Sequence, residues 1–252
     1  MRLKLRVAYD GAAFRGWQSQ REGGAVQDVL REAFACCAGG APVSVQGSGR
    51  TDTGVHATGQ VAHVDVPDGR DPRSWQRAVN AVLPPSVRIL SCIRASRDFH
   101  ARYSATGKSY DYLIWTGEVL PPHLAGRCWH VRPAPDVSLL RQAAQALRGR
   151  HDFRGFAANR GTPVHSTVRH LRSVTVTARG PRVRLRFEGD GFLYKMVRML
   201  AAAMVRFAQG KAGLGDLLAR LEGCDSRLPR EVAPAAGLYL VRVDYVRRKH
   251  QG

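Results

Sequence analysis

The stretch VSVQGSGRTDTGVHATGQVAHVDV, residues 43–66, places a glycine-rich loop between two apolar segments. Val43 to Gly47 and Gln60 to Val66 are expected to form strands, because β-branched residues recur in both and turn residues separate them. Four of the fourteen residues from Gly47 to Gln60 are glycine, which permits positive φ and close backbone approach. The stretch therefore predicts two strands joined by a shaped, irregular loop.

The middle of this loop carries a single acid, Asp52, with Arg50 two residues before it and His56 four residues after it. A compact loop that presents one carboxylate beside one guanidinium indicates a site more than a spacer. The rest of the chain has to indicate what this site acts on.

Working outward, the first part of the chain has the order β-α-β-β-α-β. Leu3, Leu5 and Val7 alternate with Lys4 and Arg6, which predicts a strand with one buried face. The remaining expected elements of this part are a helix over 26–37, the two strands above, a helix over 72–83 and a strand over 87–96.

The second part repeats that order. Its expected elements are a strand over 108–115, a helix over 137–147 capped by Asp136, strands over 168–177 and 182–188, a helix over 192–209 and a strand over 237–246. The repeat predicts an α/β (α+β) chain of two ferredoxin-like halves with mainly antiparallel sheets. We expect domains at residues 1–104 and 105–252, with a basic active-site cleft between them, because ligand sites often lie between domains.

The charge of the chain points to a polyanionic partner. Thirty-nine Lys and Arg residues against twenty Asp and Glu residues give a net charge of +19 in 252 residues. Nucleic acid is the first candidate for such a partner. An Arg-rich composition inherited from a GC-biased genome is the alternative that charge alone leaves open.

Other classes of protein fit the sequence poorly. No apolar run approaches the roughly 20 residues that span a bilayer. Basic and apolar residues alternate at the N-terminus, whereas a signal peptide has an uninterrupted apolar region. The five cysteines form no CxxC pair, and the histidines show no ligand spacing, which argues against a disulfide framework and a metal site. We expect a cytoplasmic protein with buried thiols and no membrane association.

Asp52 has three interpretations. An Asp in a glycine-rich loop commonly forms an Asx-turn, with its side chain bonded to the backbone two residues on. The triplet Asp52-Thr53-Gly54 matches that of aspartic proteases, but their chemistry needs two carboxylates and this chain has one such triplet. The third interpretation is a lone carboxylate acting on a nucleotide that has been flipped out of an RNA helix.

The third interpretation agrees with a family resemblance. The run GRTDTGVHATGQV (residues 49–61) resembles the catalytic motif of tRNA pseudouridine synthase A. Five further blocks, in the same order as in that family, are similar to its other conserved segments: residues 7–20, 98–114, 151–156, 190–200 and 233–245. The family's usual residue after the Asp is Ala, and this chain has Thr53, which leaves the nucleophile in place.

The resemblance implies a role for each of four residues. Asp52 is the implied nucleophile, Tyr110 is implied to stack on the flipped uracil, and Arg198 to pair with Asp52 across the cleft. Arg50 is implied to hold the loop or fill the gap left by the base. From the residues alone, a core tyrosine is an equally good interpretation of Tyr110, and a solvated helix arginine is the favoured interpretation of Arg198.

The resemblance also implies a substrate and partners. It implies isomerisation of uridine to pseudouridine in the anticodon stem-loop of tRNA, at positions 38–40, by a homodimer that needs no cofactor and no metal. A non-catalytic RNA-binding module of the same fold is the alternative from a different functional class.

Overall fold

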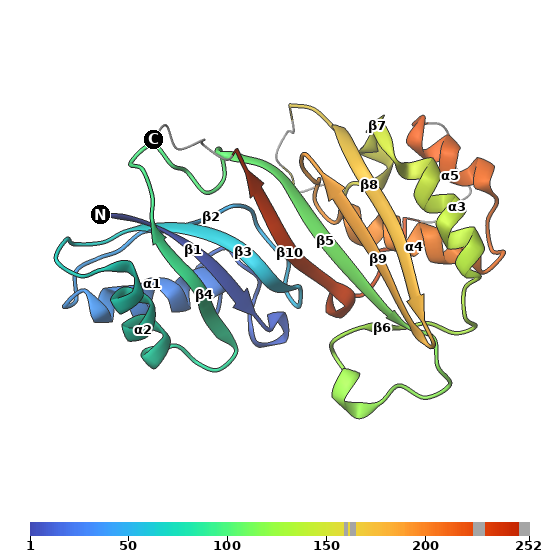
Figure 1. Cartoon of the computed structure of the whole chain (residues 1–252). Coiled ribbons are helices and arrows are strands. Elements are labelled where there is room, and N and C mark those ends of the chain that lie inside the picture. The colour runs from blue at the N-terminus through green and yellow to red at the C-terminus, as the bar shows by residue number, and fades with distance from the viewer. Residues whose placement is uncertain (159–160, 162–164, 224–229, 247–252) are drawn as a thin grey trace. The chain divides into compact units, whose positions relative to one another are not determined.

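The alternation at the N-terminus forms the first strand of the computed structural model, β1 (Arg2–Tyr9). Leu3, Leu5 and Val7 are fully buried, whereas Lys4 is half-buried and Arg6 is exposed. The structure describes residues 1–158, 161, 165–223 and 230–246 (Figure 1). Among these residues, no helix is both long enough and apolar enough to cross a membrane.

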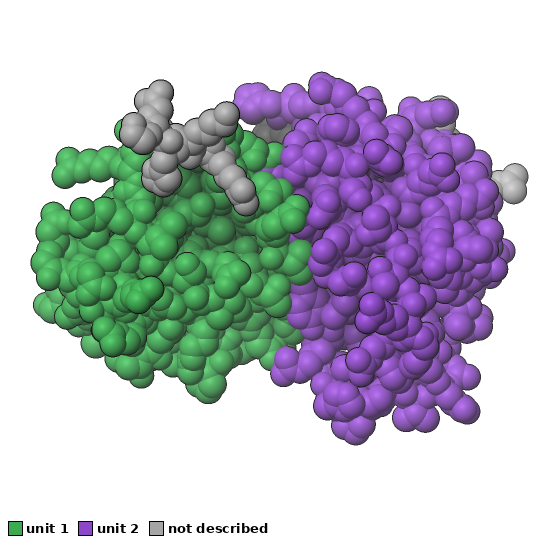
Figure 2. Space-filling view, in the orientation of Figure 1, with its two compact units in different colours: residues 1–106, 240–252 green, residues 107–239 purple. Residues whose placement is uncertain are grey.

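The chain divides into two compact units (Figure 2). Unit 1 holds residues 1–106 and the chain from Leu240 onward, and unit 2 holds residues 107–239. The division of the sequence into domains at residues 104 and 105 stays a prediction. The last strand, β10 (Leu238–Tyr245), begins in unit 2 and continues in unit 1.

Unit 1 has the predicted β-α-β-β-α-β order. After β1 come the helix α1 (Val26–Cys37), the strands β2 (Val45–Gly47) and β3 (His56–Asp65), the helix α2 (Pro72–Val82) and the strand β4 (Val87–Arg94). A short 3₁₀ turn, η1 (Gly11–Ala13), follows β1. Asp71 begins α2 by accepting the N–H groups of Arg73 and Ser74, and Pro72 takes the first turn, where its missing N–H costs nothing.

The sheet of unit 1 is ferredoxin-like. Its strand order is β4-β1-β3-β10, with β2 also paired to β3. β1 runs antiparallel to β3 and β4, and β2 runs antiparallel to β3 with Val45 opposite Val64. The helices α1 and α2 cover the face that holds Leu3 and Leu5, and their Phe34 and Trp75 rings pack 6.0 Å apart (Figure 1). The predicted fold class is confirmed for this unit.

Unit 2 repeats the order with additions. Its main elements are β5 (Ala105–Trp115), which begins in unit 1, α3 (Val137–Leu147), β8 (Val168–Arg179), β9 (Arg182–Gly189) and α4 (Met196–Ala208). The added elements are η2 (Pro122–Leu124), β6 (Trp129–His130), β7 (Gly149–Asp152), η3 (Phe153–Phe156), α5 (Leu214–Leu221) and η4 (Ala235–Gly237). The pairing order β5-β9-β8-β7 is antiparallel where the register is defined, and β6 pairs with β5 in parallel.

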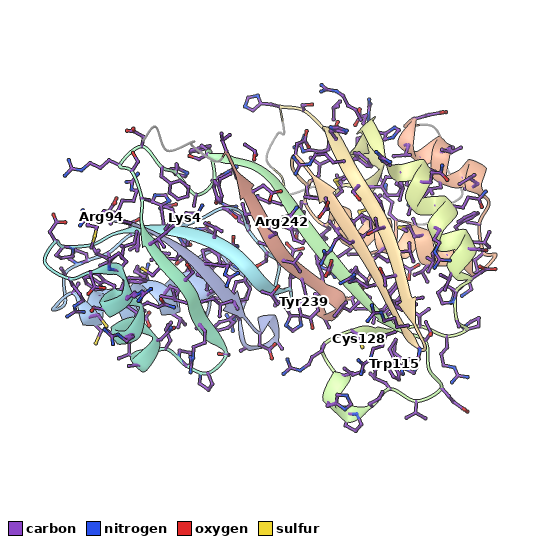
Figure 3. All side chains as sticks on the ribbon, viewed as in Figure 1. Lys4, Arg94, Trp115, Cys128, Tyr239 and Arg242 are labelled. Atoms are coloured by element: carbon purple, nitrogen blue, oxygen red, sulfur yellow. The ribbon has the colours of Figure 1, made fainter. Side chains whose placement is uncertain are left out.

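The two faces of the β5-β9 pair differ in polarity. Tyr110 lies opposite Phe187 and Tyr112 opposite Leu185, and all four side chains are buried. The alternate positions of β9 carry Arg182, Arg184 and Arg186, which are exposed or half-exposed. Unit 2 is therefore a sheet with one apolar and one arginine-rich face. Figure 3 shows all described side chains on the ribbon, with Trp115 labelled on β5.

The helix predicted over 192–209 begins four residues later than expected. Lys195 has φ 58°, in the left-handed region, and α4 starts at Met196. The segment just before α4 is not helical, because its apolar side chains pack elsewhere. Leu193 is buried, and the Phe192 ring lies 5.0 Å from the Tyr110 ring. Tertiary packing of two apolar side chains thus displaces the start that helical spacing indicated.

An ion pair between a buried carboxylate and a half-buried guanidinium joins β5 to β9. Arg186 donates from Nε to Asp111 Oδ1 at 2.6 Å and from Nη2 to Oδ2 at 2.8 Å, and the two residues face each other in register. Asp111 is only 8% exposed. This bidentate contact raises the pKa of Arg186, mainly through the hydrogen bond to the carboxylate.

We predict that Asp111→Ala destabilises the protein by about 1–3 kcal/mol, because the guanidinium loses its charge-assisted partner in a half-buried place. Urea unfolding at neutral pH measures the change. Asp68→Ala is the control, since Asp68 is 79% exposed in its side chain and pairs with the N-terminal amine at 3.4 Å. Equal stability losses in the two variants would contradict the assignment.

Candidate functional site

The glycine-rich loop joins β2 to β3 in unit 1 as predicted. Asp52 is half-buried in it, whereas Arg50 and Thr53 are exposed. Gly54 has φ 78°, and the Val55 N–H donates to the carbonyl of Asp52 at 3.1 Å, which closes a tight turn around the acid. The loop therefore turns tightly at Asp52 and leaves this residue half-buried, not fully buried.

Buried hydrogen bonds fix the ends of the loop. Ser48 and Gln60 are fully buried, and Ser48 Oγ donates to Gln60 Oε1 at 2.7 Å. Gln60 Nε2 in turn donates to the carbonyl of Gly49 at 3.0 Å. The Ser48 N–H donates to the carbonyl of Val61 at 2.7 Å. A polar network in which each buried group has a partner rigidifies the chain that it joins.

A second segment, residues 9–17 after β1, holds the residue immediately before Asp52. The Tyr9 hydroxyl and Thr51 Oγ1 share a buried hydrogen bond of 2.8 Å. The Trp17 N–H donates to the carbonyl of Thr51 at 3.1 Å. Gly16 has φ +83°, and a Cβ there would lie 2.8 Å from the Thr51 carbonyl oxygen.

The same segment holds the residues that follow Asp52. A Cβ on Gly11 would lie 2.1 Å from the carbonyl oxygen of Val55, so only glycine fits against this backbone. The Gly11 N–H donates to Nδ1 of His56 at 3.1 Å, and His56 is 2% exposed. Asp52 is thus held on both sides by a segment more than 30 residues away in sequence.

Buried aromatic side chains belong to the segment that holds the Asp52 loop. Tyr9, Phe14 and Trp17 are all buried, and the Tyr9 ring lies 6.0 Å from Trp17 and 6.4 Å from Phe14. Burial raises the pKa of Tyr9 well above its usual range, so its hydroxyl keeps its proton. The sequence reasoning missed Tyr9, Thr51, Ser48 and Gln60. The only signal for Tyr9, Thr51 and Gln60 was their place in the motif blocks at residues 7–20 and 49–61, and Ser48 lies just before the second block.

Tyr110 lies on the apolar face of unit 2. It is 8% exposed, and its ring meets Phe192 edge-on at 5.0 Å with an interplanar angle of 77°. Two residues on, Tyr112 is fully buried and its hydroxyl donates to the carbonyl of Pro234 at 2.7 Å. The packing against Phe192 fixes the orientation of the Tyr110 ring.

Arg198 stands on the one polar stripe of α4. Every residue of α4 is buried except Arg198 and Arg206, which are half-buried. Arg198 Nε donates to the carbonyl of Ala233 at 2.7 Å, and the Ala233 N–H donates back to the carbonyl of Arg198 at 3.3 Å. Arg198 is therefore a positioned guanidinium and not a solvated helix arginine.

The structure brings Arg50 and Asp52 together in one loop of unit 1, and it places Tyr110 and Arg198 in unit 2. The pairing of Arg198 with Asp52 stays a prediction, as does the basic cleft. In the described part of the chain, no group of three His, Cys, Asp or Glu side chains is arranged to hold a metal.

The cysteine expectation needs a correction. Cys92 is buried, but Cys37 and Cys128 are half-buried, and Cys36 is exposed at the end of α1. Helical spacing placed Cys37 on the inner face of α1, and the helix ends there, so neither Cys36 nor Cys37 is fully covered. Cys224 lies outside the described residues.

Comparisons with known proteins agree on one family. A family model described as tRNA pseudouridine synthase matches residues 6–104 and 143–246. The tRNA pseudouridine synthase A of Solidesulfovibrio magneticus is 44% identical over 255 residues, covering 97% of this chain and 91% of the relative. Those of Bordetella avium and Akkermansia muciniphila are 41% and 44% identical, covering 97% of this chain and 91% and 95% of the relatives.

We predict that Gly16→Ala destabilises the protein more than Gly23→Ala. Both glycines have positive φ, which costs an alanine about 1–2 kcal/mol, but only Gly16 also approaches the Thr51 carbonyl. No atom lies within 4 Å of a Cβ on Gly23, so this variant isolates the backbone cost. Urea unfolding of both variants measures the difference, and equal losses would show that the contact at Thr51 adds nothing.

Proposed function

This chain belongs to the tRNA pseudouridine synthase family, and on that basis we propose that it isomerises uridine to pseudouridine in the anticodon stem-loop of tRNA. The observation that carries the proposal is the presentation of Asp52. Asp52 is half-buried in a loop whose backbone is fixed on both sides of it by buried contacts. A nucleophile held in this way loses little freedom when its substrate binds.

Asp52 is assigned the role of nucleophile. It attacks either the ribose carbon that carries the base or the uracil ring, and the bond between that carbon and the ring nitrogen breaks. The uracil rotates and rejoins the ribose through its C5, and the bond to Asp52 breaks, which regenerates the carboxylate. The C5 proton then leaves, and the ring nitrogen takes up a proton. Reactant and product are isomers, so the reaction needs no redox partner, no energy input and no cofactor.

Tyr110, Arg50 and Arg198 are assigned supporting roles. Tyr110 stacks on the flipped uracil and its hydroxyl takes part in the loss of the C5 proton. Arg50 is exposed beside Asp52, where it holds the loop or fills the gap left by the base. Arg198 is the cation that pairs with Asp52, and its bond to Ala233 supports this role because it fixes the guanidinium.

The proposal extends to the RNA partner, the oligomeric state and the cellular location of the protein. The net charge of +19 supports contact with the tRNA backbone, because phosphate neutralisation by Lys and Arg drives non-specific RNA binding. We also propose that the protein acts as a homodimer in the cytoplasm and modifies uridines at positions 38–40. A non-catalytic RNA-binding module remains the alternative that experiment has to separate.

The first test is Asp52→Asn, which keeps the shape of the side chain and removes its nucleophilic charge. We predict that release of label from uracil C5 falls by about 10³-fold or more, as expected for loss of a nucleophile. Affinity for tRNA stays within about threefold of the unchanged protein, because Asp52 is one acid on a basic chain.

Asp68→Asn is the matched control for this test, since it removes the same charge from an exposed position in unit 1. It should release label as the unchanged protein does. Undiminished release from Asp52→Asn would remove Asp52 from the mechanism. Binding of tRNA without release of label by the unchanged protein would favour the non-catalytic alternative.

The second test is Tyr110→Phe, which keeps the ring and its packing on Phe192 but removes the hydroxyl. We predict a fall in turnover of about 10²-fold, typical of a general base, with little change in tRNA affinity. Tyr239→Phe is the control, because the Tyr239 hydroxyl donates to the carbonyl of Arg127 at 2.7 Å and has no role in the proposed reaction (Figure 3 labels Tyr239). Single-turnover rates at saturating enzyme measure the effect, and a normal rate for Tyr110→Phe would remove the role of its hydroxyl.

A further inference from the structure

Unit 1 carries a strongly exposed aromatic side chain that neither the fold nor the proposed reaction uses. Tyr103 lies in the turn between β4 and β5 and is 77% exposed. Its ring is not loose, because it lies 4.4 Å from the His100 ring at an interplanar angle of 34°. One face of the tyrosine thus rests on histidine, and most of the remaining ring is in solvent.

The His100 ring is itself supported from below. It lies 4.7 Å from the ring of His63 on β3, and His63 meets Phe99 edge-on at 6.2 Å. Phe99 in turn lies 5.1 Å from Tyr245 on β10. Lys4 Nζ on β1 lies 3.9 Å from the centre of the Tyr245 ring. The rings of Tyr245, Phe99, His63 and His100 therefore form a series of contacts that begins at the sheet of unit 1 and ends at the exposed ring of Tyr103.

The backbone of the turn is fixed by its own hydrogen bonds. Each amide from His100 to Ser104 has an acceptor. Those of Arg102 and Tyr103 both donate to His100 Nδ1, at 3.1 and 3.3 Å. The Ala101 amide donates to His63 Nδ1 at 3.1 Å. The His100 amide donates to Ser104 Oγ at 3.0 Å, and the Ser104 amide donates to the carbonyl of His100 at 2.9 Å.

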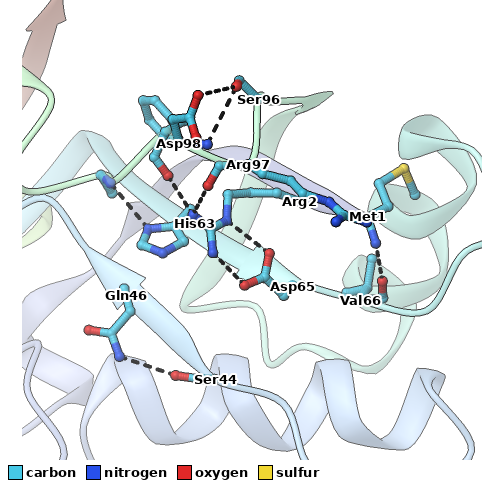
Figure 4. Close-up of polar contacts among 12 residues, drawn as sticks. Met1, Arg2, Ser44, Gln46, His63, Asp65, Val66, Ser96, Arg97 and Asp98 are labelled. Atoms are coloured by element: carbon cyan, nitrogen blue, oxygen red, sulfur yellow. Dashed lines mark hydrogen bonds and ion pairs between the residues drawn. The ribbon is translucent and has the colours of Figure 1, made fainter.

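Below the turn, His63 lies beside the ion pair of Arg2 with Asp65 (Figure 4). Burial, with help from the neighbouring Arg2 and His100, lowers the pKa of His63 to about 4. The imidazole is therefore uncharged at neutral pH, and its Nδ1 accepts the Ala101 amide. The Tyr245 hydroxyl donates to the carbonyl of the same residue at 2.8 Å. The turn is thus tied to β3 and β10 before any ligand arrives.

The charge around the turn selects the kind of ligand. Arg94, Arg97 and Arg102 are exposed in this segment against one exposed acid, Asp98. The Arg102 guanidinium lies 5.7 Å from the centre of the Tyr103 ring. An exposed ring with a guanidinium beside it suits a nucleobase that stacks on the ring while its phosphate meets the cation.

We propose that Tyr103 is a preformed stacking platform for an unpaired nucleobase of the bound tRNA, with Arg102 contacting the adjacent phosphate. This inference rests on the proposed function for its ligand and adds a contact outside the reacting uridine. The rigidity of the turn supports it, because a ring that is already oriented loses little freedom on binding. Base stacking on an aromatic side chain is sequence-tolerant, so the platform adds affinity and not sequence preference.

The test compares the equilibrium binding of one unmodified tRNA transcript to the unchanged protein, Tyr103→Ala, Tyr103→Phe and Arg102→Gln at several salt concentrations. Tyr103→Ala should weaken binding by about 5- to 150-fold, with an unchanged salt dependence, because stacking releases no counterions. Tyr103→Phe should bind normally, and Arg102→Gln should lower the salt slope by about one phosphate. Val119→Ala is the control, since Val119 is 74% exposed in unit 2.

Several outcomes would overturn the platform. Normal binding by Tyr103→Ala would do so, as would equal losses in Tyr103→Phe and Tyr103→Ala, which would assign the contact to the hydroxyl. A change in oligomeric state of Tyr103→Ala on gel filtration would assign the ring to a second copy of the chain.

Photo-crosslinking of the unchanged protein to tRNA, mapped by mass spectrometry, keeps the proposal testable even if Tyr103→Ala does not fold. A crosslink at Tyr103 supports the platform, and crosslinks confined to other residues contradict it. Failure of the proposed function is distinguishable from failure of the platform, because in that case the unchanged protein neither binds nor modifies tRNA.

Discussion

The site in unit 1 depends on the close approach of two backbone segments, residues 9–17 and residues 51–56. Glycines at positions 11 and 16 remove the side chains that would collide with Val55 and Thr51, and the Tyr9 hydroxyl then reaches Thr51. A Cβ 2.1 Å from a backbone oxygen cannot be accommodated by a rotamer change, so this approach is a strict constraint. It fixes the backbone on both sides of Asp52, which is half-buried.

In unit 2, contacts of the side chains themselves hold the candidate site residues in place. Phe192 sets the orientation of the Tyr110 ring, and the carbonyl of Ala233 holds the guanidinium of Arg198. Phe192 lies just before α4, and Ala233 lies in the irregular segment before η4. The left-handed conformation of Lys195 belongs to this arrangement, because it lets residues 192–194 pack before the helix begins.

Much of the fold could be predicted from sequence, because periodicity reports which side chains are buried. The alternation of Leu3, Leu5 and Val7 predicted β1, and Asp71 and Asp136 cap helices that begin where the pattern indicated. Short elements such as β6 and β7 were missed, since two to four residues carry too little periodicity. The start of α4 was wrong because a tertiary contact, invisible to local spacing, decided it.

The candidate site was predictable only in part. Asp52 and Arg50 stand out in a glycine-rich loop, and Tyr110 and Arg198 followed from the family resemblance. The supporting Tyr9, Thr51 and Gln60 did not stand out, because their function comes from contacts between residues far apart in sequence. Tyr103 did not stand out either. It lies in a mostly polar segment without a periodic pattern, and its 77% exposure is visible only in the structure.

The most direct test of the central claim is to map pseudouridine at single-nucleotide resolution in unmodified bulk tRNA, before and after incubation with the purified protein and no added cofactor. The account predicts new pseudouridine in the anticodon stem-loop, at positions 38–40. No new pseudouridine, or new pseudouridine only outside the anticodon stem-loop, would contradict it.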